Sequence, residues 1–438
     1  MRMRSLVISI VLLPCLLISV MAQDGVVSLG LQGVIDAAVE TSEFLKIKKS
    51  TADKNSGLYA QTRANLLPHV TASNVWRYAM EAPQGTGRDD YMDYYQEAQL
   101  NASQVVWSFG KVGYAVAAAK RVVEADMYGW AAGKEDVMYR AKVAYFSGIL
   151  ARNSQKISEQ SYQNCIANKQ LLEKRAYGGR SSKYENIRVS AEAASRVPAV
   201  NEARAQKDIA YETIKNLIDF DRQKGIELNG DFGQDYADID YEALVPLMEG
   251  QEPSLRYLNK SFDAARLLTK SARGAFLPTI SIFTTIKYFF GSDKQQLMTN
   301  NEYSRYETVG FRVDVPIFEG GENWAKLKQA KADRDIAKLQ LKQARKELLL
   351  ELRKAYLRYQ QYKDNLAANI EAVNLAQESY KQAQEMFANG QVSFSDLNDA
   401  ELLLTNQSLN KEMTLFNINE ALARIEKLIA QDYDQTNV

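Results

Sequence analysis

The chain has 438 residues, of which 46% are hydrophobic, and its 54 Lys and Arg are matched by 54 Asp and Glu. Such a balance offers no basic surface for nucleic acid. The sequence holds no phosphate-binding loop of the Walker or dinucleotide kind, no Cys/His cluster and no Ser-His-Asp set, so we expect neither an enzyme nor a cofactor or metal. The one histidine, His69, follows a proline at the start of an expected strand, where a structural or interfacial role is the simpler interpretation.

Residues 1–22 have the features of a cleavable secretory signal. A basic start precedes an apolar run over residues 6–20, which is too short to span a bilayer as a helix, and cleavage is expected after Ala22. Cys15 could instead mark a lipoprotein, but Pro14 before it and the apolar residues after it argue against lipidation. Without the signal, Cys165 is the only cysteine left, so no intrachain disulfide is expected.

A helix is expected over residues 23–66, because apolar residues recur at helical spacing from Leu31 to Ala38. Pro68 then favours extended chain, since the residue before a proline is biased away from helix. Two strands around a glycine-containing loop are expected over residues 67–107.

The strand signal is clearest later in the chain, where apolar and polar residues alternate. One face carries Ile280, Ile282, Thr284, Ile286, Tyr288 and Phe290. The other carries Thr279, Ser281, Thr285 and Lys287, with Phe283 and Phe289 as exceptions. The next strand alternates in the same way and places Arg312 and Asp314 on its polar side. The pattern predicts a sheet with one lipid-facing side and one side, carrying Lys287, Arg312 and Asp314, that faces a wet lumen.

A soluble sheet with one face on a helical core is the alternative. Strands of about 10 residues can cross a bilayer when tilted, and the expected strands reach that length. Aromatic residues also gather at their ends, as in the interfacial girdle of a membrane barrel. Both observations favour the membrane.

Residues 111–177 and 322–389 contain no proline and are rich in good helix formers. Each would form a helix about 100 Å long. Helices of that length need lateral partners, and their many alanines favour close packing as coiled coils.

Each long helix is expected to end in a glycine turn, at Gly178 and at Gly390. Ser393 or Ser395 is expected to cap the helix that returns from the second turn. Pro198 should kink or break the helix that returns from the first turn.

Residues 225–252 carry eight acidic residues and no Lys or Arg. We interpret them as a solvated surface insert.

Three landmarks occur twice in the same order. Leu67-Pro68 returns as Leu277-Pro278, Phe109-Gly110 as Phe318-Glu319-Gly320, and Gly178 as Gly390, at offsets of 210, 209 and 212 residues. The chain is therefore predicted to contain two diverged copies of one unit, each with a helix, a pair of strands and a long helical hairpin.

Two strands in each copy make four, which are too few to close a barrel, and open sheet edges are not tolerated in lipid. The chain must therefore oligomerise and pool its strands. Eight strands from a dimer would enclose only side chains, whereas twelve strands from a trimer would leave a lumen. The predicted product is a conduit.

In their order and duplication, these features resemble the TolC-type outer-membrane efflux proteins, also called outer-membrane factors. The resemblance covers essentially the whole mature chain. It implies an α+β membrane fold, in which a trimeric 12-stranded β-barrel with four strands per chain is continued by a long α-helical coiled-coil barrel, with two internal structural repeats.

The same resemblance implies an exit duct of a tripartite efflux or type I secretion system, in the outer membrane of a Gram-negative bacterium. Its partners would be outer-membrane lipid, two further copies of the chain, a periplasmic adaptor (membrane fusion) protein and an inner-membrane RND or ABC transporter. A wide water-filled tube contacts its substrate weakly, so cargo specificity is expected in the pump and adaptor. The alternative function is a periplasmic coiled-coil scaffold whose strands are soluble.

The implied division of the chain has the following segments, in order: a signal peptide (1–22), an N-terminal helix of repeat 1 (23–66), a first transmembrane β-hairpin (67–107), a first long periplasmic helical hairpin (108–222), an acidic equatorial insert (223–252), a helix of repeat 2 (253–276), a second transmembrane β-hairpin (277–317), a second long periplasmic helical hairpin (318–432) and a C-terminal tail (433–438).

Asp396 and Asp399 resemble the family's pair of aspartates just inside the periplasmic mouth of the tunnel, and residues three apart share a helix face. A trimer would then hold six carboxylates around a constriction, which would act as a cation-attracting gate. Helix capping is the alternative, and it explains Asp396 better than Asp399.

The first copy departs from this pattern, because Tyr184 stands where an acid is expected. A surface charge is an equally good interpretation of Arg180. The residues expected in tip closure and adaptor contact are Tyr177, Gly178, Gly179, Arg180, Tyr184, Asn389, Gly390 and Gln391.

Overall fold

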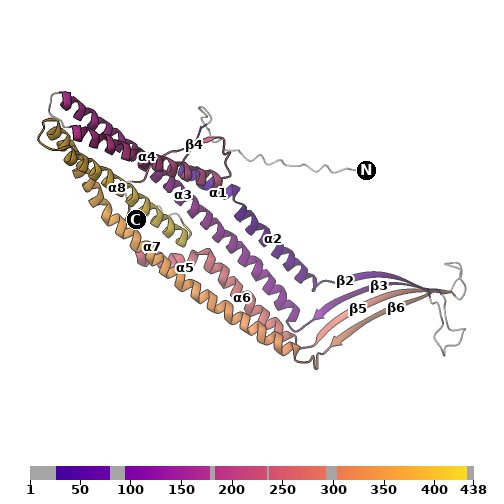
Figure 1. Ribbon diagram of the computed structural model, residues 1–438. Helices are drawn as coiled ribbons and strands as arrows, with labels where there is room; N and C mark the ends of the chain where they lie inside the picture. The colour runs from indigo at the N-terminus through magenta and orange to yellow at the C-terminus, as the bar shows by residue number, and fades with distance from the viewer. Residues whose placement is uncertain (1–25, 79–93, 178–182, 234–235, 293–302, 432–438) are drawn as a thin grey trace, which may run out of the picture. The chain divides into compact units, whose positions relative to one another are not determined.

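The computed structural model describes residues 26–78, 94–177, 183–233, 236–292 and 303–431 (Figure 1). The predicted signal peptide, the lipidation candidate Cys15, the C-terminal tail and the turn residues Gly178, Gly179 and Arg180 lie outside the described residues. The chain forms two compact units, and each contains segments from both predicted copies. We call Met1–Ser42, Val137–Tyr236 and Tyr359–Ala423 the hairpin unit, and Glu43–Asp136, Ala237–Arg358 and Arg424–Val438 the sheet unit.

The sheet unit contains one four-stranded sheet in the order β2-β3-β5-β6 (Figure 1). Its strands are β2 (His69–Tyr78), β3 (Tyr94–Trp107), β5 (Thr279–Ser292) and β6 (Tyr303–Asp314), and every pairing is antiparallel. Within the described residues, β2 and β6 each have one neighbouring strand, so they are the edges of this sheet.

The register gives the sheet one polar and one apolar side. One row across the four strands is Thr71, Asn101, Thr285 and Thr308, and the next row is Val70, Ala102, Thr284 and Val309. Successive residues of a strand point to opposite faces, so these rows lie on opposite sides of the sheet. The alternation read from the sequence is confirmed.

Phe283 departs from this alternation for a reason that the register reveals. It lies opposite Gly310 on the polar side, where a Cβ on that glycine would come within 2.9 Å of the Phe283 ring. The ring therefore fills the space that the missing side chain leaves. The Arg312 guanidinium lies 5.4 Å from the ring centroid, which favours a cation–π contact.

Both units contain parts of two very long helices. α3 (Lys111–Tyr177) and α7 (Glu322–Ala388) have 67 residues each, and the helices that follow them are α4 (Lys183–Leu217) and α8 (Phe394–Ile429). The other helices are α1 (Leu31–Thr41), α2 (Glu43–Ala64), α5 (Tyr241–Gln251) and α6 (Pro253–Gly274). No helix among the described residues is long and apolar enough to cross a membrane.

The expected break at Pro198 is not found, because α4 continues through it. A proline removes one helical hydrogen bond and leaves the carbonyl four residues earlier without its partner. Here both Pro198 and Ala194, which carries that carbonyl, are exposed, so water can satisfy the oxygen. The buried side of the helix, at Ala193 and Arg196, is undisturbed.

The interpretation of residues 225–252 as a solvated insert is wrong for its first part. β4 (Gly225–Leu228) pairs in parallel with β1 (Val26–Leu29), and Ile226, Leu228 and Phe232 are buried in the hairpin unit. Arg152 on α3 also donates to the Leu228 carbonyl at 2.8 Å. The acidic composition obscured a short apolar strand whose partner lies about 200 residues earlier in the chain.

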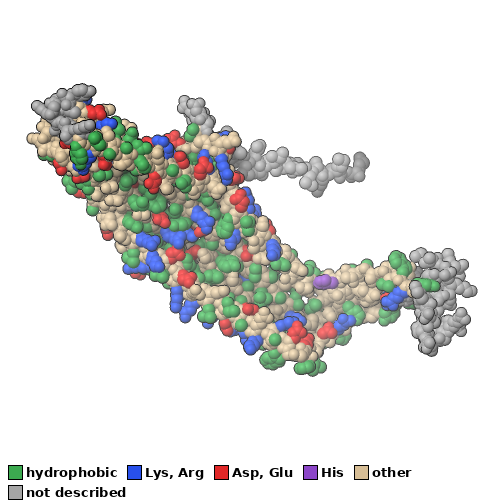
Figure 2. Space-filling model, viewed as in Figure 1, with side chains coloured by type: hydrophobic (Ala, Val, Ile, Leu, Met, Phe, Trp, Pro, Cys, Tyr) green, Lys and Arg blue, Asp and Glu red, His purple; other side chains and the backbone are tan. Residues whose placement is uncertain are grey.

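Figure 2 shows Lys and Arg side chains intermixed with Asp and Glu over the helices of the displayed face. This distribution agrees with the balanced composition of the chain.

The close contact between α6 and α3 in the sheet unit yields a first prediction. A Cβ at Gly274 would lie 2.7 Å from the backbone nitrogen of Lys111, whereas Gly113 has nothing within 4 Å of such an atom. We expect Gly274→Ala to lower the stability of the protein by about 1–3 kcal/mol, because neither backbone can yield without disturbing its helix. Gly113→Ala, in the first turn of α3, should instead leave the stability unchanged or raise it by about 0.5 kcal/mol, because alanine is the better helix former.

Thermal unfolding of the detergent-solubilised protein, followed by circular dichroism, measures both variants. A Gly274→Ala midpoint equal to that of the wild type would show that the two helices do not approach this closely.

Candidate functional site

The turn between α7 and α8 is a helix C-cap built on glycine. Gly390 has a φ of 80°, in the left-handed region that favours glycine. Its N–H donates to the Phe387 carbonyl at 3.0 Å, and the Gln391 N–H donates to the Met386 carbonyl at 2.9 Å. These two bonds define a Schellman motif, which satisfies carbonyls at the end of the helix. The predicted glycine turn at Gly390 is confirmed.

Three residues further on, Ser393 and Asp396 form a capping box at the start of α8. The Ser393 hydroxyl accepts the Asp396 N–H at 3.2 Å, while the Asp396 carboxylate accepts the Ser393 N–H at 2.9 Å and its hydroxyl at 2.7 Å. Of the two serines proposed as caps, Ser393 is therefore the one that caps the helix. The expected capping role of Asp396 is confirmed.

The Ser393 hydroxyl and then its N–H lower the pKa of Asp396 below its ordinary value of 3.8. A carboxyl group with a lowered pKa stabilises the fold above its ordinary pKa, and this contribution is lost as the pH falls through the lowered value. Asp396 is therefore ionised at neutral pH.

An apolar cluster lies directly beneath this turn in the hairpin unit. Phe387 and Phe394 flank the turn with ring centroids 6.4 Å apart, and Leu397 is completely buried. Val392 packs against the same cluster, so Val392 and Leu397 occupy the positions of a hydrophobic staple around the Ser393 cap. Leu172 of α3 and Val189 of α4 complete the cluster. The turn is thus fixed against both hairpins.

The two predicted gate residues lie one helical turn apart on the exposed side of α8. Asp396 and Asp399 are exposed, whereas Phe394, Leu397 and Glu401 are buried on the opposite side. Within the described part of the chain, no side-chain hydrogen bond or ion pair is found for Asp399. Two carboxylates on one exposed helix face provide an arrangement that can attract cations.

Of the residues expected in tip closure, Arg180 and the side chain of Tyr177 lie outside the described residues. Tyr177 is the last residue of α3, and Tyr184, in the first turn of α4, is 71% exposed. No hydrogen bond between Tyr184 and Asp396 occurs in the described structure. Instead Arg188 of α4 donates to the Ser395 hydroxyl of α8 at 3.1 Å. Arg188 was missed because nothing in the sequence indicates which side of α4 meets α8.

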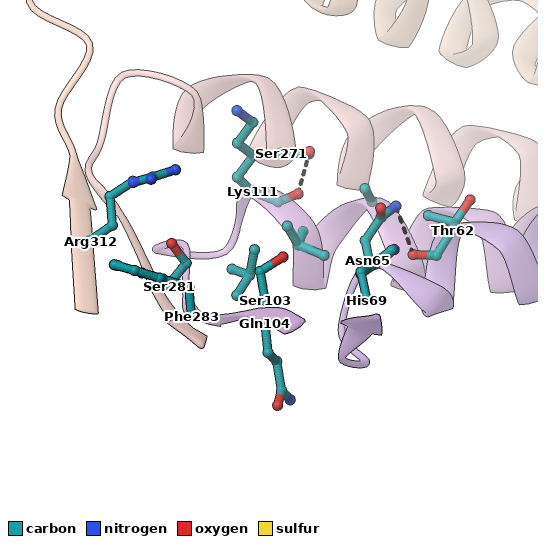
Figure 3. Close-up of a pocket in the computed structure, with 13 residues that line it drawn as sticks. Thr62, Asn65, His69, Ser103, Gln104, Lys111, Ser271, Ser281, Phe283 and Arg312 are labelled. Atoms are coloured by element: carbon teal, nitrogen blue, oxygen red, sulfur yellow. Dashed lines mark hydrogen bonds between the residues drawn. The ribbon is translucent and has the colours of Figure 1, made fainter. Parts of the chain in front are cut away.

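The predicted lumen residues lie in the sheet unit. Arg312 lines a cavity of about 520 Å³ on the polar side of the sheet, together with His69, Ser103, Ser281 and Phe283 among others (Figure 3). Figure 3 also shows the Ser271 hydroxyl bonded to the Lys111 carbonyl, and both residues line this cavity.

The other two predicted lumen residues lie on β5 and β6. Lys287 forms an ion pair with Glu97 on β3, and Asp314 lies opposite Thr279 at the end of the sheet. His69 Nδ1 is 3.1 Å from the Leu67 carbonyl oxygen, as a structural role requires. No group of three or more His, Cys, Asp and Glu that could hold a metal occurs among the described residues.

Comparison with known proteins gives this architecture a family. Residues 244–431 match the model of the family described as outer membrane efflux protein. The chain is 23% identical over 308 residues to the alkaline protease secretion protein AprF of Pseudomonas aeruginosa, a match that covers 67% of this chain and 62% of that relative. It is 22% identical over 398 residues to the cation efflux system protein CusC of Escherichia coli, which covers 86% and 81%. Its fold matches the crystal structure of the Campylobacter jejuni CmeC outer membrane channel with a TM-score of 0.82 and 19% identity, over 93% and 87% of the two chains.

Long helices combined with an antiparallel sheet define a TolC-like fold, and the class of protein is a non-enzymatic channel of the outer membrane with a long periplasmic helical portion. Residues 244–431 of the chain are similar to the outer membrane efflux protein family, and AprF and CusC are relatives at 23% and 22% identity. Channels of this family act with an adaptor and an inner-membrane transporter.

The capping box predicts a local effect of removing Ser393. Loss of a serine cap costs about 1 kcal/mol, so Ser393→Ala should speed hydrogen exchange of the first turn of α8 about fivefold. Mass spectrometry of peptides that cover residues 390–400 measures this change. Ser408→Ala, which removes only a hydroxyl bonded to the Leu404 carbonyl within α8, is the matched control. Equal exchange in the two variants would mean that the box does not hold the turn.

Proposed function

We propose that three copies of this chain form the exit duct of a tripartite efflux or type I secretion system. The observation that carries the proposal is the sheet, which has a polar side, an apolar side and two edges that no other described strand pairs with. Joining β6 of one copy to β2 of the next closes a barrel of twelve strands, since each copy supplies four. Twelve strands leave a lumen, whereas eight would be filled by side chains.

The exposure of the apolar side supports this placement. Val309, Phe311 and Val313 of β6 are 83%, 76% and 49% exposed. They share one face of the strand, and a protein in water would bury such a row. In a barrel they form part of the band that meets lipid, while Lys287, Arg312 and Asp314 line the water-filled interior.

Equal helix lengths support the duplication. α3 and α7 each have 67 residues, and α4 and α8 have 35 and 36. We therefore assign residues 108–222 and 318–432 to two periplasmic hairpins of one ancestral unit, residues 67–107 and 277–317 to its two membrane hairpins, and residues 1–22 to the secretory signal. The hairpins of three copies would continue the barrel as a helical tunnel.

We further propose that the hairpin turns meet a periplasmic adaptor, which links the duct to an RND or ABC transporter. Asn389, Gly390 and Gln391 are exposed, as such a contact requires. Tyr177, Gly178, Gly179, Arg180 and Tyr184 would make the corresponding contact from the first hairpin. One relative is named for protease secretion and another for cation efflux, so the duct itself is expected to leave the choice of cargo to its pump.

At the periplasmic end, Asp396 and Asp399 from three copies would ring the mouth with six carboxylates. The capping box keeps the first of them ionised, and its side chain is exposed. The ring would attract cations and slow anions.

Fractionation distinguishes this duct from a periplasmic scaffold. The duct should sediment with outer membranes, require detergent for extraction and run as a trimer that heat dissociates. A monomer that stays in solution without detergent would end the proposal in favour of the scaffold.

The gate itself is tested by single-channel recording in planar bilayers. Asp396→Asn with Asp399→Asn should abolish cation selectivity and block by divalent cations, because the charge is lost while an asparagine at position 396 still accepts the Ser393 N–H. Glu202→Gln with Asp208→Asn, which removes two exposed acids of α4, is the matched control and should behave as the wild type. Unchanged selectivity in the first pair would refute the gate and leave the duct.

A further inference from the structure

A charged side chain of α8 lies on its buried side, close to the two aspartates. Glu401 is 1% exposed, and its Oε2 lies 2.5 Å from Nη1 of Arg196, which is 8% exposed on α4. The Thr405 hydroxyl donates to the other carboxylate oxygen at 3.0 Å. An ion pair so completely removed from water joins the two helical hairpins.

Arg196 also reaches two further helical positions. It donates from Nη1 to the Ser161 hydroxyl of α3 and from Nη2 to the Asn398 side-chain oxygen at 2.9 Å. Glu192, one turn earlier on α4, lies 3.6 Å away and is partly exposed. A single guanidinium therefore ties α3, α4 and α8 together, and its planar fork fixes their relative directions more strictly than a flexible ammonium would.

The position of these contacts along α8 decides what they can control. Asn398 stands between Asp396 and Asp399 in the chain, and Glu401 follows two residues after them. At about 100° per residue, Glu401 points to the side of the helix roughly opposite the two aspartates. Any rotation of α8 that pulls Glu401 or Asn398 away from Arg196 turns the aspartates through the same angle.

Stability alone does not account for this cluster. A buried ion pair contributes little compared with apolar residues of the same size, although loss of one partner is strongly unfavourable. The surrounding positions Leu172, Val189, Tyr380 and Leu397 already form an apolar core. The directional contacts of Arg196 fix the rotation of α8 about its axis more strictly than apolar packing alone would.

We propose that Arg196 is a positioning residue for the gate: through Glu401 and Asn398 it fixes the rotation of α8 that presents Asp396 and Asp399 on the exposed face. This inference rests on the proposed gate function of the two aspartates. It assigns a role in selectivity to a side chain that itself never meets the transported solute.

The chain carries its own reporter of this cluster. Cys165 on α3 is 2% exposed beside Arg196, and burial raises the pKa of its thiol. Reaction of this thiol with a maleimide therefore requires the helices to separate. The other cysteine, Cys15, lies in the predicted signal. The mature chain would therefore have Cys165 as its one thiol, and the labelling rate would report on this residue alone.

Four variants separate positioning from folding. Arg196→Met leaves Glu401 buried without its partner, so Cys165 should react about tenfold faster or more. Arg196→Met with Glu401→Met restores an uncharged, filled core, and Asn398→Ala removes only the contact beside the aspartates. Asn419→Ala is the control, because this α8 asparagine bonds Tyr236 and the Leu415 carbonyl about 30 Å further along the helix.

We expect the Met/Met variant and Asn398→Ala to keep Cys165 protected and yet to lose most of the wild-type cation selectivity in bilayer recordings, while Asn419→Ala keeps it. If both retain full selectivity while the Asp396→Asn/Asp399→Asn variant loses it, the gate stands and the positioning role of Arg196 is refuted. If that double asparagine variant is itself unchanged, the gate fails and this inference fails with it. Labelling at the wild-type rate in Arg196→Met would show that the ion pair does not hold the helices, which also overturns the inference.

Discussion

Hydrocarbon supplies neither donors nor acceptors for the backbone groups along the edge of a sheet, and everything proposed for this chain depends on that constraint. The four described strands leave β2 and β6 as edges, and the apolar side of the sheet is widely exposed. In lipid, the two edges of an isolated chain would lack hydrogen-bond partners, and in water its apolar side would be exposed. In the proposed duct, closure by further copies would satisfy the edges and give the polar side a water-filled space to face.

Between α7 and α8 the chain must reverse its direction within a few residues, and the turn must also pack against the α3–α4 hairpin. Residues 386–397 meet it with three local devices, namely a glycine C-cap, a serine capping box and a hydrophobic staple. Each device is short in range, and all three converge on one apolar cluster. The first turn of α8, which carries Asp396, is consequently held in place by several local contacts, as the proposed gate would require.

Features set by local patterns could be predicted from the sequence, and features set by distant partners could not. The long helices, the alternating strands and the turn at Gly390 follow from proline spacing, period-two alternation and the preference of glycine for positive φ. The β1–β4 pair could not be predicted, because the four residues of β4 lie in an acidic stretch and form a strand only by pairing with β1, about 200 residues earlier in the chain. Nothing in the sequence pairs Arg196 with Glu401, which lies 205 residues later in the chain, and Phe283 was an exception to the alternation until Gly310 was found opposite it. The break that was one of the two outcomes expected at Pro198 is not found, and the exposure of the helix face that tolerates this proline could not be known before its packing partners were.

Capping and gating are usually weighed as alternatives for an acid in a first helical turn, but at Asp396 they support each other. A capping carboxylate is held by donors that favour its ionised form, so the same bonds that close the helix also maintain the charge that a cation-attracting ring requires. Asp399 has no such support among the described residues, and its placement depends on the rotation of α8 alone. The cap fixes Asp396, whereas the direction of Asp399 depends on how α8 is rotated about its axis. A contact on the opposite side of α8 would fix that rotation. If the two aspartates form the proposed gate, the Arg196–Glu401 pair supplies this contact, which would account for a charge buried at this place.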